Sequence, residues 1–499
     1  DTDDDNDSVL DIDDQCTPGQ VNSYSLGMSD HDSDGCDDHL MFISNAFFEG
    51  DDTDVITDIF FDSNDNQIIA GYSLGNYSKF ENYNITTDPN HAGYSFVAKI
   101  NSSGNIDWFI YTFNDYYIKI ALSSDDSIYL SSTLLTNLTW HTSSGNFAIS
   151  DTNNFVDPYV MKISNQGNIE WIEHNENLGD QTLEKIAIGE QNNAIISIFN
   201  YNGSILSYGS QTFTLNSLEG FFLNISSSGD WGSDIISIES PNPVANDGAI
   251  FDYISNTDNG YMAIVSYQDI PIVNIKKNGI FQCSISKNNS QSSFDILSIT
   301  VFHDWNCQDS INIEANYGYA EAWINDMIVE FNTTSNNLSI VVAGAMEADT
   351  YNYSTLEFGN WGIITPLGEY TNEGAKAYVG QIYFDSNISG NSLNWDYLMW
   401  DDSYGYYSTF TDITYSEHAF VLCGNFYSFM NLVDGLSLPN ILTLYSITNS
   451  DYDSMCLLDY DSGSSQVFGS LGYIYQQFGF YNSDILTAID LDKTGRALI

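Results

Sequence analysis

Short apolar runs alternate with polar turns along most of this chain. From about residue 40 onward, strand-length runs rich in Ile, Val, Phe and Tyr are bounded by Asn, Ser, Gly and Asp. The sequence contains only eight prolines, and no long segment repeats apolar residues with the period of a helix. The pattern therefore predicts an all-β protein.

One strand–turn–strand unit recurs along this β-rich region. Its clearest copies read FVAKINSSGNIDWFIY from Phe96 and YVMKISNQGNIEWIE from Tyr159, and weaker copies begin at Phe221, Phe281, Tyr378, Thr443 and Ile485. A second class of apolar strand precedes each copy and reads QIIAGYSL, SIYLSSTL, AIISIFNY, YMAIVSYQ, SIVVAGAM, AFVLCGNF and GYIYQQFG. Four strands in about 60 residues, repeated seven times, predict a β-propeller of seven four-stranded blades.

The turns of the two clearest copies resemble the β-propeller repeats of secreted bacterial and archaeal proteins. In those repeats a strand ending in Lys-Ile or Lys-Leu is followed by x-x-G-x-I-x-W, and the other copies match by pattern only. The chain ends in TGRALI, which in other copies leads into the outer strand, and a segment from Leu40 supplies its partner. We therefore expect the two termini to share one blade, which closes the ring and removes its edges.

The interval between the copies at Phe281 and Tyr378 is longer than the other intervals. We interpret residues 303–328 as a loop insertion whose base is held by a disulfide between Cys283 and Cys307. An eighth, degenerate blade is the alternative.

The first 38 residues differ from the rest because aspartates recur at alternate positions. Calcium takes about six to eight hard oxygen ligands, and alternate residues on a tightly curled loop can direct their carboxylates at one ion. A solvated acidic linker is the alternative. The expected ligands are Asp3, Asp5, Asp7, the main-chain carbonyl of Val9, Asp11 and Asp14 in a first loop, and Asp30, Asp32, Asp34 and Asp38 in a second.

This spacing resembles the thrombospondin type 3 calcium repeat, D-x-D-x-D-G-x-x-D-x-x-D-x-C. Ser8 stands where the repeat has Gly, whereas the second copy has Gly35 in place but lacks some downstream acids. The resemblance implies that Ca²⁺ neutralises the aspartates, and that the arm loosens without the ion because the carboxylates repel each other. The expected domains are thus an Asp-rich arm over residues 1–38 and a β-propeller over residues 39–499.

The net charge limits the possible partners. There are 68 acidic residues against 11 basic ones, which gives −57. Binding to phosphates needs clustered Lys and Arg, so the composition excludes nucleic acid and disfavours anionic membranes. The expected partners are cations, and further copies of the chain once cations screen or bridge the charge.

The six cysteines form three sequence-local couples, Cys16 with Cys36, Cys283 with Cys307 and Cys423 with Cys456. Six cysteines allow about fifteen connectivities, of which we favour the local one. Three disulfides indicate an oxidising compartment. No apolar run approaches the roughly 20 residues of a transmembrane helix, and neither an initiator Met nor a signal peptide occurs. We therefore expect a mature protein that is secreted or lies at the cell surface.

N-x-S/T sequons along the chain permit N-glycosylation, although Asn and Ser are common enough to give a comparable number by chance. The candidate asparagines are Asn76, Asn84, Asn101, Asn137, Asn202, Asn224, Asn288, Asn332, Asn337, Asn352 and Asn387.

Catalytic motifs are weak. GYSLG at residues 71–75 matches the nucleophile elbow G-x-S-x-G, but it lies in the second strand class and runs on without a helix, so we interpret Ser73 as a strand or turn residue. Acids are too abundant for a pair at glycosidase separation to be informative. No local HxH, HExxH or HxxxH pair occurs among the histidines, which are His31, His39, His91, His141, His174, His303 and His418.

Three functions are compatible with these observations. We favour a non-enzymatic extracellular structural protein whose calcium-bound arm docks on a neighbouring copy, because a head-to-tail contact that does not close generates a filament or sheath. The first alternative is an adhesion or glycan-binding propeller, for which the aromatic stretches at 351–361 and 400–410 are the candidate surfaces. A polysaccharide-acting enzyme with its site at the propeller mouth is the second alternative.

Overall fold

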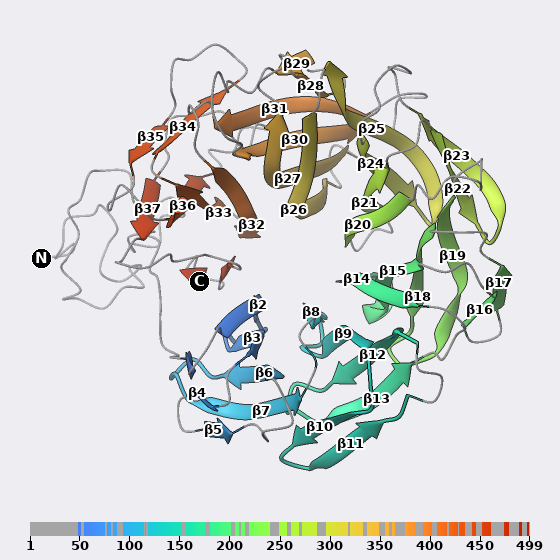
Figure 1. Ribbon diagram of the computed structural model, residues 1–499, viewed down its shortest axis with the longest axis vertical. Helices are drawn as coiled ribbons and strands as arrows, with labels where there is room; N and C mark the ends of the chain where they lie inside the picture. The colour runs from blue at the N-terminus through green and yellow to red at the C-terminus, as the bar shows by residue number, and fades with distance from the viewer. Residues whose placement is uncertain are drawn as a thin grey trace, which may run out of the picture.

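The computed structural model consists of β-sheets that stand side by side around a common centre (Figure 1). It describes residues 48–498 except 51–53, 75–76, 81–82, 87–92, 114, 116–117, 152–154, 175–179, 201–204, 209–210, 215–218, 240–248, 257–260, 269–271, 287–295, 318–319, 333–336, 349–354, 359–361, 365–374, 386–392, 402–406, 417–418, 428, 435–441, 446–451, 461–473, 479–488 and 492–496. Within these residues the only helical element is one 3₁₀ turn, η1 (Glu190–Asn192). The all-β prediction is confirmed.

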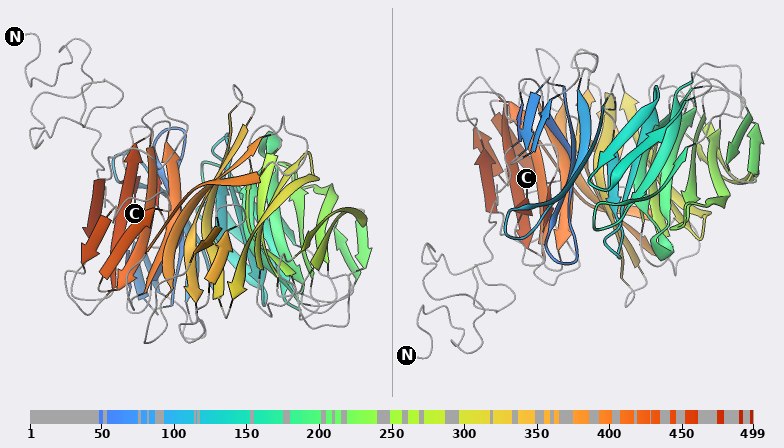
Figure 2. Two further views of the ribbon diagram at one scale, coloured as in Figure 1. Left: turned by 90° about the horizontal axis from the view of Figure 1, so that it is seen from above. Right: turned by 90° about the horizontal axis from the view of Figure 1, so that it is seen from below.

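Six antiparallel four-stranded meanders, here called units 1 to 6, form the body. Unit 1 consists of β2 (Asp54–Phe61), β3 (Gln67–Ser73), β6 (Tyr94–Ile100) and β7 (Ile106–Phe113). Unit 2 consists of β8 (Lys119–Leu122), β9 (Ile128–Leu134), β12 (Asp157–Ile163) and β13 (Ile169–His174). Unit 3 consists of β14 (Gln181–Ile188), β15 (Ala194–Asn200), β18 (Glu219–Ile225) and β19 (Trp231–Glu239). Unit 4 consists of β20 (Ala249–Asn256), β21 (Tyr261–Gln268), β24 (Ile296–His303) and β25 (Asn306–Tyr317). Unit 5 consists of β26 (Ala320–Asn332), β27 (Asn337–Ala348), β30 (Lys376–Asp385) and β31 (Leu393–Asp401). Unit 6 consists of β32 (Ser408–Ser416), β33 (Ala419–Tyr427), β36 (Tyr452–Tyr460) and β37 (Ile474–Phe478). The first strand of each unit lies nearest the centre, and the strands run across the thickness of the disc (Figures 1 and 2).

Hairpins tie consecutive units together. Each of these hairpins lies in the sequence between the second and third strands of one unit, and it pairs with the outermost strand of the preceding unit. The four that do so are β10 (Leu138–Thr142) with β11 (Gly145–Ile149) on β7, β22 (Ile272–Lys277) with β23 (Ile280–Ser286) on β19, β28 (Thr355–Phe358) with β29 (Gly362–Ile364) on β25, and β34 (Phe429–Asp434) with β35 (Leu442–Tyr445) on β31. Main-chain hydrogen bonds therefore cross from unit to unit.

The remaining short strands lie outside this scheme or at the ends of the chain. Hairpin β16 (Ile205–Tyr208) with β17 (Gln211–Thr214) forms a separate two-stranded sheet, and β4 (Tyr77–Phe80) with β5 (Tyr83–Thr86) pairs with β1 (Phe48–Gly50). The last hairpin, β38 (Asp490–Leu491) with β39 (Ala497–Leu498), is hydrogen-bonded to both unit 6 and unit 1. The C-terminal end of the chain thus joins the first and last units (Figure 1).

The second and third strands of a unit are apolar because neighbouring units cover both of their faces. All seven residues of β6 and of β12 are buried. One core cluster joins Ile68 and Val97 of unit 1 to Leu130 of unit 2, and another joins Val265 of unit 4 to Ile340 of unit 5. Face-to-face packing of sheets therefore supplies the core.

The repeated G-N-I-x-W motif forms a second link between units. The indole nitrogen of Trp108, in unit 1, donates to the carbonyl of Asn165 at 3.0 Å in the turn of unit 2. Gly167 of that turn has φ +77°, and a Cβ there would lie 2.6 Å from the Trp108 ring. Trp171 makes the same bond to the next unit, to the carbonyl of Ser227 at 3.1 Å.

Two sequence-based expectations are corrected. Residues 303–328, expected to be a loop insertion, contain the outer strand β25 and the start of the inner strand β26. The copies at Phe281 and Thr443 lie in the hairpin strands β23 and β35, whereas the third strands of units 4 and 6 are β24 and β36. The error arose because a hairpin strand and a unit strand have the same period-two apolar pattern.

Candidate functional site

A β-bulge recurs in the first strands, which surround the centre. The register with the second strand shifts in units 1, 3, 4, 5 and 6, and such a bulge turns the strand and re-aims the following side chain. The residues just after the bulge are Asp58, Lys185, Tyr253, Asp326 and Asp412. The repeat thus has a polar or charged residue at the same position of the first strand in five of the six units.

Glycine in the second strand accommodates the bulge in three of these units. A Cβ at that glycine would overlap a main-chain carbonyl oxygen of the bulged strand, so no larger residue fits without displacement. The glycine and carbonyl pairs are Gly71 with Val55, Gly344 with Trp323, and Gly424 with Thr409.

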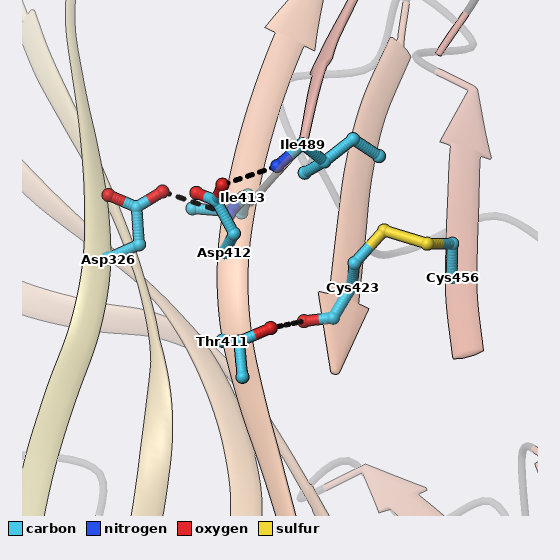
Figure 3. The surroundings of a disulfide bond; sticks show 7 residues. All are labelled: Asp326, Thr411, Asp412, Ile413, Cys423, Cys456 and Ile489. Atoms are coloured by element: carbon cyan, nitrogen blue, oxygen red, sulfur yellow. Dashed lines mark hydrogen bonds between the residues drawn. A yellow bond between two sulfur atoms is a disulfide. The ribbon is translucent and has the colours of Figure 1, made fainter. Parts of the chain in front are cut away.

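The aspartates that follow the bulges join one unit to the next. Each accepts a hydrogen bond from a main-chain N–H on the first strand of the following unit or on the C-terminal segment, and Figure 3 shows the bonds of Asp326 and Asp412. The pairs are Asp58 with Ile120, Asp326 Oδ2 with Ile413 at 2.9 Å, and Asp412 Oδ2 with Ile489 at 2.6 Å. A carboxylate in this position satisfies a donor that the adjacent sheet leaves unpaired.

Asp490 on β38 completes this series where the ends of the chain meet. Its Oδ2 accepts the Phe61 N–H of unit 1 at 2.7 Å, and its Oδ1 accepts the Thr414 hydroxyl of unit 6 at 3.0 Å. One side chain therefore connects the first unit, the last unit and the C-terminal hairpin. We call Asp58, Asp326, Asp412 and Asp490 the inner carboxylates.

Burial and like charge perturb two of these carboxyl groups. Burial raises the pKa of Asp58, although the ammonium groups of Lys119 and Lys185 act in the opposite direction, and Lys119 Nζ lies 3.9 Å from Asp58 Oδ1. Burial, followed by the charge of Asp326 and a hydrogen bond to it, raises the pKa of Asp412 well above its ordinary value. Two carboxyl groups in contact hold a proton more tightly than a separate one.

The oxygens of the Asp326–Asp412 pair are occupied by main-chain donors. Asp326 Oδ1 accepts the Met327 N–H at 2.8 Å, and Asp412 Oδ1 accepts the Ile413 N–H at 2.9 Å, in addition to the bonds between units. A general acid or base must reach a substrate proton, whereas these groups are aimed at the backbone. The arrangement acts chemically as a set of structural joints.

Other buried acids serve the same purpose at other boundaries. Asp115 lies between units 1 and 2 and accepts the Ser132 hydroxyl at 2.7 Å and the Tyr159 hydroxyl at 2.5 Å. Burial, together with Asp115, raises the pKa of Tyr159 well above its ordinary value. Asp401 of unit 5 accepts the hydroxyl of Ser408, the first residue of unit 6, at 2.6 Å.

Turns at the end of the first strands add polar contacts between units 1, 2 and 3. The Ser63 main-chain N–H and hydroxyl donate to the Asp126 carboxylate at 2.8 and 2.6 Å. The Ser124 hydroxyl of unit 2 donates to Asn192 Oδ1 of unit 3 at 2.8 Å. These contacts are exposed, so we expect each to contribute little stability.

Two of the three expected disulfides are confirmed. Cys423 and Cys456 face each other across β33 and β36 and are fully buried, and Cys283 of hairpin β22–β23 is bonded to Cys307 of β25. The second disulfide links the hairpin on unit 3 to the outer strand of unit 4. Cys16 and Cys36 lie outside the described residues, as do all the expected calcium ligands, from Asp3 to Asp38.

The other candidate residues are placed in strands or in the core. Ser73 is a buried residue of β3, as the repeat pattern predicts. Phe358 and Phe410, from the two aromatic stretches, are fully buried, so neither side chain is open to a glycan. Tyr351, Tyr353, Trp361, Tyr404 and Tyr406 of those stretches lie outside the described residues.

Three histidines are described, and they lie on separate sheets. His141 stacks on Tyr111 with ring centroids 4.9 Å apart, His174 ends β13, and His303 lies beside Tyr261 at 4.3 Å. In the part of the chain that the structure describes, no three His, Cys, Asp or Glu side chains form a group suited to a metal ion. His31, His39, His91 and His418 lie outside that part.

The sequons differ in their accessibility. Asn137 is exposed, Asn101 and Asn337 are partly exposed, and Asn84 and Asn332 lie in β5 and β26. Asn224 lies in β18 between two paired strands, and its buried Oδ1 is so close to Gly232 that a Cβ there would overlap it. Asn76, Asn202, Asn288, Asn352 and Asn387 lie outside the described residues.

We expect Asn137 to carry a glycan and Asn224 to carry none when the chain is secreted from a host with N-glycosylation. A glycan on Asn137 projects into solvent, whereas one on Asn224 would separate β18 from β19. Intact mass spectrometry of Asn137→Gln and Asn224→Gln measures the difference. Loss of one glycan from the first variant alone is the expected result, and loss from the second variant contradicts it.

Comparisons with known proteins do not assign this chain to a family. No protein-family model matches it, and no curated protein matches it significantly. Among solved structures, the extracellular domain of the putative one component system BT4673 from B. thetaiotaomicron aligns over 83% of this chain and 96% of that chain, with 9% sequence identity and a TM-score of 0.13. A likeness this small carries no argument. None of the described residues form a helix long and apolar enough to cross a membrane.

The inner carboxylates are the residues that sequence reasoning missed. Acids are so common here that none stood out by type alone. A usable signal was nevertheless present, because Thr57-Asp58-Ile59, Asn325-Asp326-Met327 and Thr411-Asp412-Ile413 each precede a strand of the second class.

Proposed function

We propose that this chain is a non-enzymatic extracellular structural protein. In this proposal a seven-bladed β-propeller carries a calcium-binding N-terminal arm, residues 1–38, that joins copies into a filament, sheath or surface layer. The observation that carries the proposal is the series of joints between units, in which buried or partly buried acids accept main-chain N–H groups of the neighbouring unit or of the C-terminal segment. Such acids hold a scaffold together and are not free for catalysis.

The seven-blade arrangement is supported by the organisation of the sheets. Units 1 to 6 are four-stranded meanders around a common centre, and hairpin β38–β39 lies between units 6 and 1 as the inner part of a seventh blade. β1 pairs with hairpin β4–β5, which leaves unit 1 at the same point as the hairpins that clasp preceding units. By this analogy β1 is the outer strand of the seventh blade.

An extracellular location is supported by the disulfides. Cys423–Cys456 and Cys283–Cys307 are both formed, and such bonds persist in oxidising compartments. A net charge of −57 keeps copies apart unless divalent cations bridge or neutralise them. Calcium, abundant outside cells, is thus the natural control on assembly.

Sedimentation velocity and electron microscopy of the full chain, with calcium and then with chelator, test this function. We expect large ordered particles with calcium that disperse to monomers with chelator. Asp5→Asn with Asp7→Asn removes two expected ligands and should raise the calcium needed for assembly by roughly tenfold. Asp4→Asn with Asp13→Asn removes the same charge from positions outside the ligand pattern and serves as the control.

Two results would contradict the proposal. A chain that stays monomeric with calcium at every concentration is not an assembling subunit. Equal effects of the two double variants would mean that net charge, rather than a calcium loop, controls assembly.

A further inference from the structure

The disulfide Cys283–Cys307 bridges units 3 and 4 at the outside of the ring. Cys283 lies in β23, which pairs with β22, and β22 in turn pairs with β19 of unit 3. Cys307 lies near the start of β25, the outer strand of unit 4. Figure 1 shows hairpin β22–β23 at the outside of the ring, next to these two units. The disulfide is therefore a covalent link across the boundary between units 3 and 4.

The two described disulfides differ in their accessibility. Cys283 and Cys307 are both partly exposed. Cys423 and Cys456 are fully buried, and their strands β33 and β36 are flanked by β32 and β37. The rate of thiol–disulfide exchange depends on access to the sulfur atoms. A reductant in solution thus reaches the Cys283–Cys307 bond first, while the protein is still folded.

At the boundary that this disulfide bridges, unit 4 directs a partly polar face toward unit 3. Ile264 and Phe302 form the apolar part of this face and pack in one cluster with Phe222 of unit 3, and the Phe222 and Phe302 rings lie 5.7 Å apart. Side chains two residues apart on a strand point to the same side of the sheet. Ser266 of β21 and Thr300 of β24 therefore also face unit 3.

The hydroxyl groups of Ser266 and Thr300 are buried without a partner. Each residue is 1% exposed, and neither hydroxyl oxygen has a hydrogen-bond partner in the part of the chain that the structure describes. Burial of a polar group without a hydrogen bond is unfavourable, whereas water satisfies the group once the surface opens. Opening of this boundary therefore relieves an unfavourable burial.

Two hydrogen bonds join the hairpin to unit 4 beside the disulfide. Asn312 Nδ2 of β25 donates to the Ser286 carbonyl at 3.1 Å, and Lys277 Nζ donates to the Asp304 carbonyl at 3.3 Å. Both bonds are exposed, so water competes for their donors and acceptors. The disulfide links residues separated by 24 positions and is not subject to that competition. Its cleavage should thus weaken the outside of this boundary more than loss of either hydrogen bond.

We propose that Cys283–Cys307 is a redox-sensitive latch on the boundary between units 3 and 4. A dithiol reductant cleaves this bond in the folded protein, while Cys423–Cys456 stays intact. The boundary then opens locally, and water reaches the hydroxyl groups of Ser266 and Thr300. The latch goes beyond the proposed function, because neither calcium nor the N-terminal arm takes part in it.

The cleavage is a thiol–disulfide exchange. One thiolate of the dithiol attacks one sulfur of the pair, which forms a mixed disulfide and releases the other cysteine as a thiolate. The second thiol of the reductant then displaces the remaining cysteine and closes a disulfide within the reductant. Two electrons and two protons of the dithiol thus pass to Cys283 and Cys307, which become thiols.

Titration of the wild-type full chain with dithiothreitol tests the latch. Alkylation of free thiols with peptide mass spectrometry follows each disulfide, and amide hydrogen exchange follows the boundary. Half-reduction of Cys283–Cys307 is expected at a reductant concentration roughly tenfold or more below that for Cys423–Cys456. Over that range, exchange in β21, β22 and β24 should become at least about fivefold faster, while exchange in β33 and β36 stays unchanged.

Two results of the titration overturn the proposal. Reduction of both disulfides together means that the reductant enters only when the fold is lost. Early reduction of Cys283–Cys307 with unchanged exchange in β21 and β24 means that closure of the boundary does not depend on the disulfide.

The double variant Cys283→Ser with Cys307→Ser reproduces the open latch without reductant. Its exchange in β21, β22 and β24 should match that of the reduced wild-type chain. Exchange at the rate of the oxidised wild-type chain overturns the latch.

A valine at position 300 tests the contribution of the unpartnered hydroxyl group. Thr300→Val keeps the shape of the side chain and removes the group that opening hydrates, so it should slow exchange in β24 of the reduced protein by roughly tenfold. Thr112→Val is the matched control, because the buried Thr112 hydroxyl donates to the Thr139 carbonyl at 3.0 Å. The control should make exchange in β7 faster. Unchanged or faster exchange in Thr300→Val overturns the opening of the boundary.

Discussion

Replacing Gly344 by alanine is expected to destabilise the protein by about 3 kcal/mol or more. The added Cβ would overlap the carbonyl oxygen of Trp323 at the bulge of β26, and it would also lie 3.0 Å from Ile324 Cα. Both obstacles are backbone atoms in a paired strand, so neither can rotate away as a side chain could. The fall in the free energy of unfolding is measured by urea denaturation.

Gly279→Ala is the matched control for Gly344→Ala. Gly279, at the tip of hairpin β22–β23, has φ +76°, and a Cβ there meets nothing within 4 Å. The control carries only the cost of a left-handed backbone conformation, about 1 kcal/mol. If the two variants lose the same stability, the close approach at the bulge is not the reason for glycine at position 344.

This prediction bears on the apparent nucleophile elbow around Ser73. Gly71 faces the bulge of β2 as Gly344 faces the bulge of β26, with its missing Cβ directed at the Val55 carbonyl. The glycine of GYSLG therefore has a structural explanation in the repeat. A sequence motif that requires a strand-to-helix turn has arisen from strand and bulge geometry.

The repeated unit could be predicted from sequence because its signals are local. Period-two apolar runs, Gly-containing turns and the G-N-I-x-W motif are all visible within about 20 residues. Trp108 and Trp171 occupy the same place in successive copies and make the same contact to the next turn. Local pattern and tertiary contact agree there.

The hairpins between units could not be predicted because their partners are distant in sequence. β22 pairs with β19, although β20 and β21 of the next unit lie between them in the sequence. Nothing in the apolar pattern of β22 identifies β19 as its partner. The extra strands lengthen some repeats. Hairpin strands at Phe281 and Thr443 were therefore matched to the third strands of other units. The supposed insertion at 303–328 followed from that displacement.

The inner carboxylates were hidden for a related reason. Asp326 and Asp412 are informative only when two neighbouring sheets are placed, since the donor of each bond belongs to the following segment of the ring. The sequence indicates the position of the bulge only weakly, and it does not indicate which strand of the neighbouring unit supplies the donor. The proposed calcium-binding arm differs, because the spacing of its aspartates is visible within a few residues of sequence. Its expected ligands remain a prediction.

Replacing Asp412 by asparagine is expected to stabilise the protein by about 1–3 kcal/mol at about pH 8 and to have little effect at about pH 4. Burial and the adjacent Asp326 raise the pKa of Asp412 in the folded state, whereas an unfolded aspartate keeps a pKa of about 3.9. The folded state then binds more protons, so stability from this pair is complete below the unfolded pKa and is lost as pH rises through the folded pKa. Asparagine keeps an oxygen for the Ile489 N–H and offers an N–H to Asp326, and the Ile413 N–H, which loses Asp412 Oδ1, keeps its bond to Asp326 Oδ2.

Urea denaturation across this pH range measures the effect. Asp304→Asn is the control, because its side chain is 70% exposed and the substitution removes the same single charge from a very acidic chain. A stabilisation that is equal in the two variants, or that grows as the pH falls, contradicts the role of the Asp326–Asp412 pair.

Acid is expected to have opposite effects on the Asp326–Asp412 pair of the ring and on the proposed calcium-binding arm. Acid protonates calcium ligands and so weakens metal binding, which should disperse assemblies. The same acid protonates Asp412, which removes the repulsion between its carboxylate and that of Asp326 inside the ring. Mild acid should therefore release stable monomers, and loss of assembly together with loss of fold would show that arm and ring are not independent.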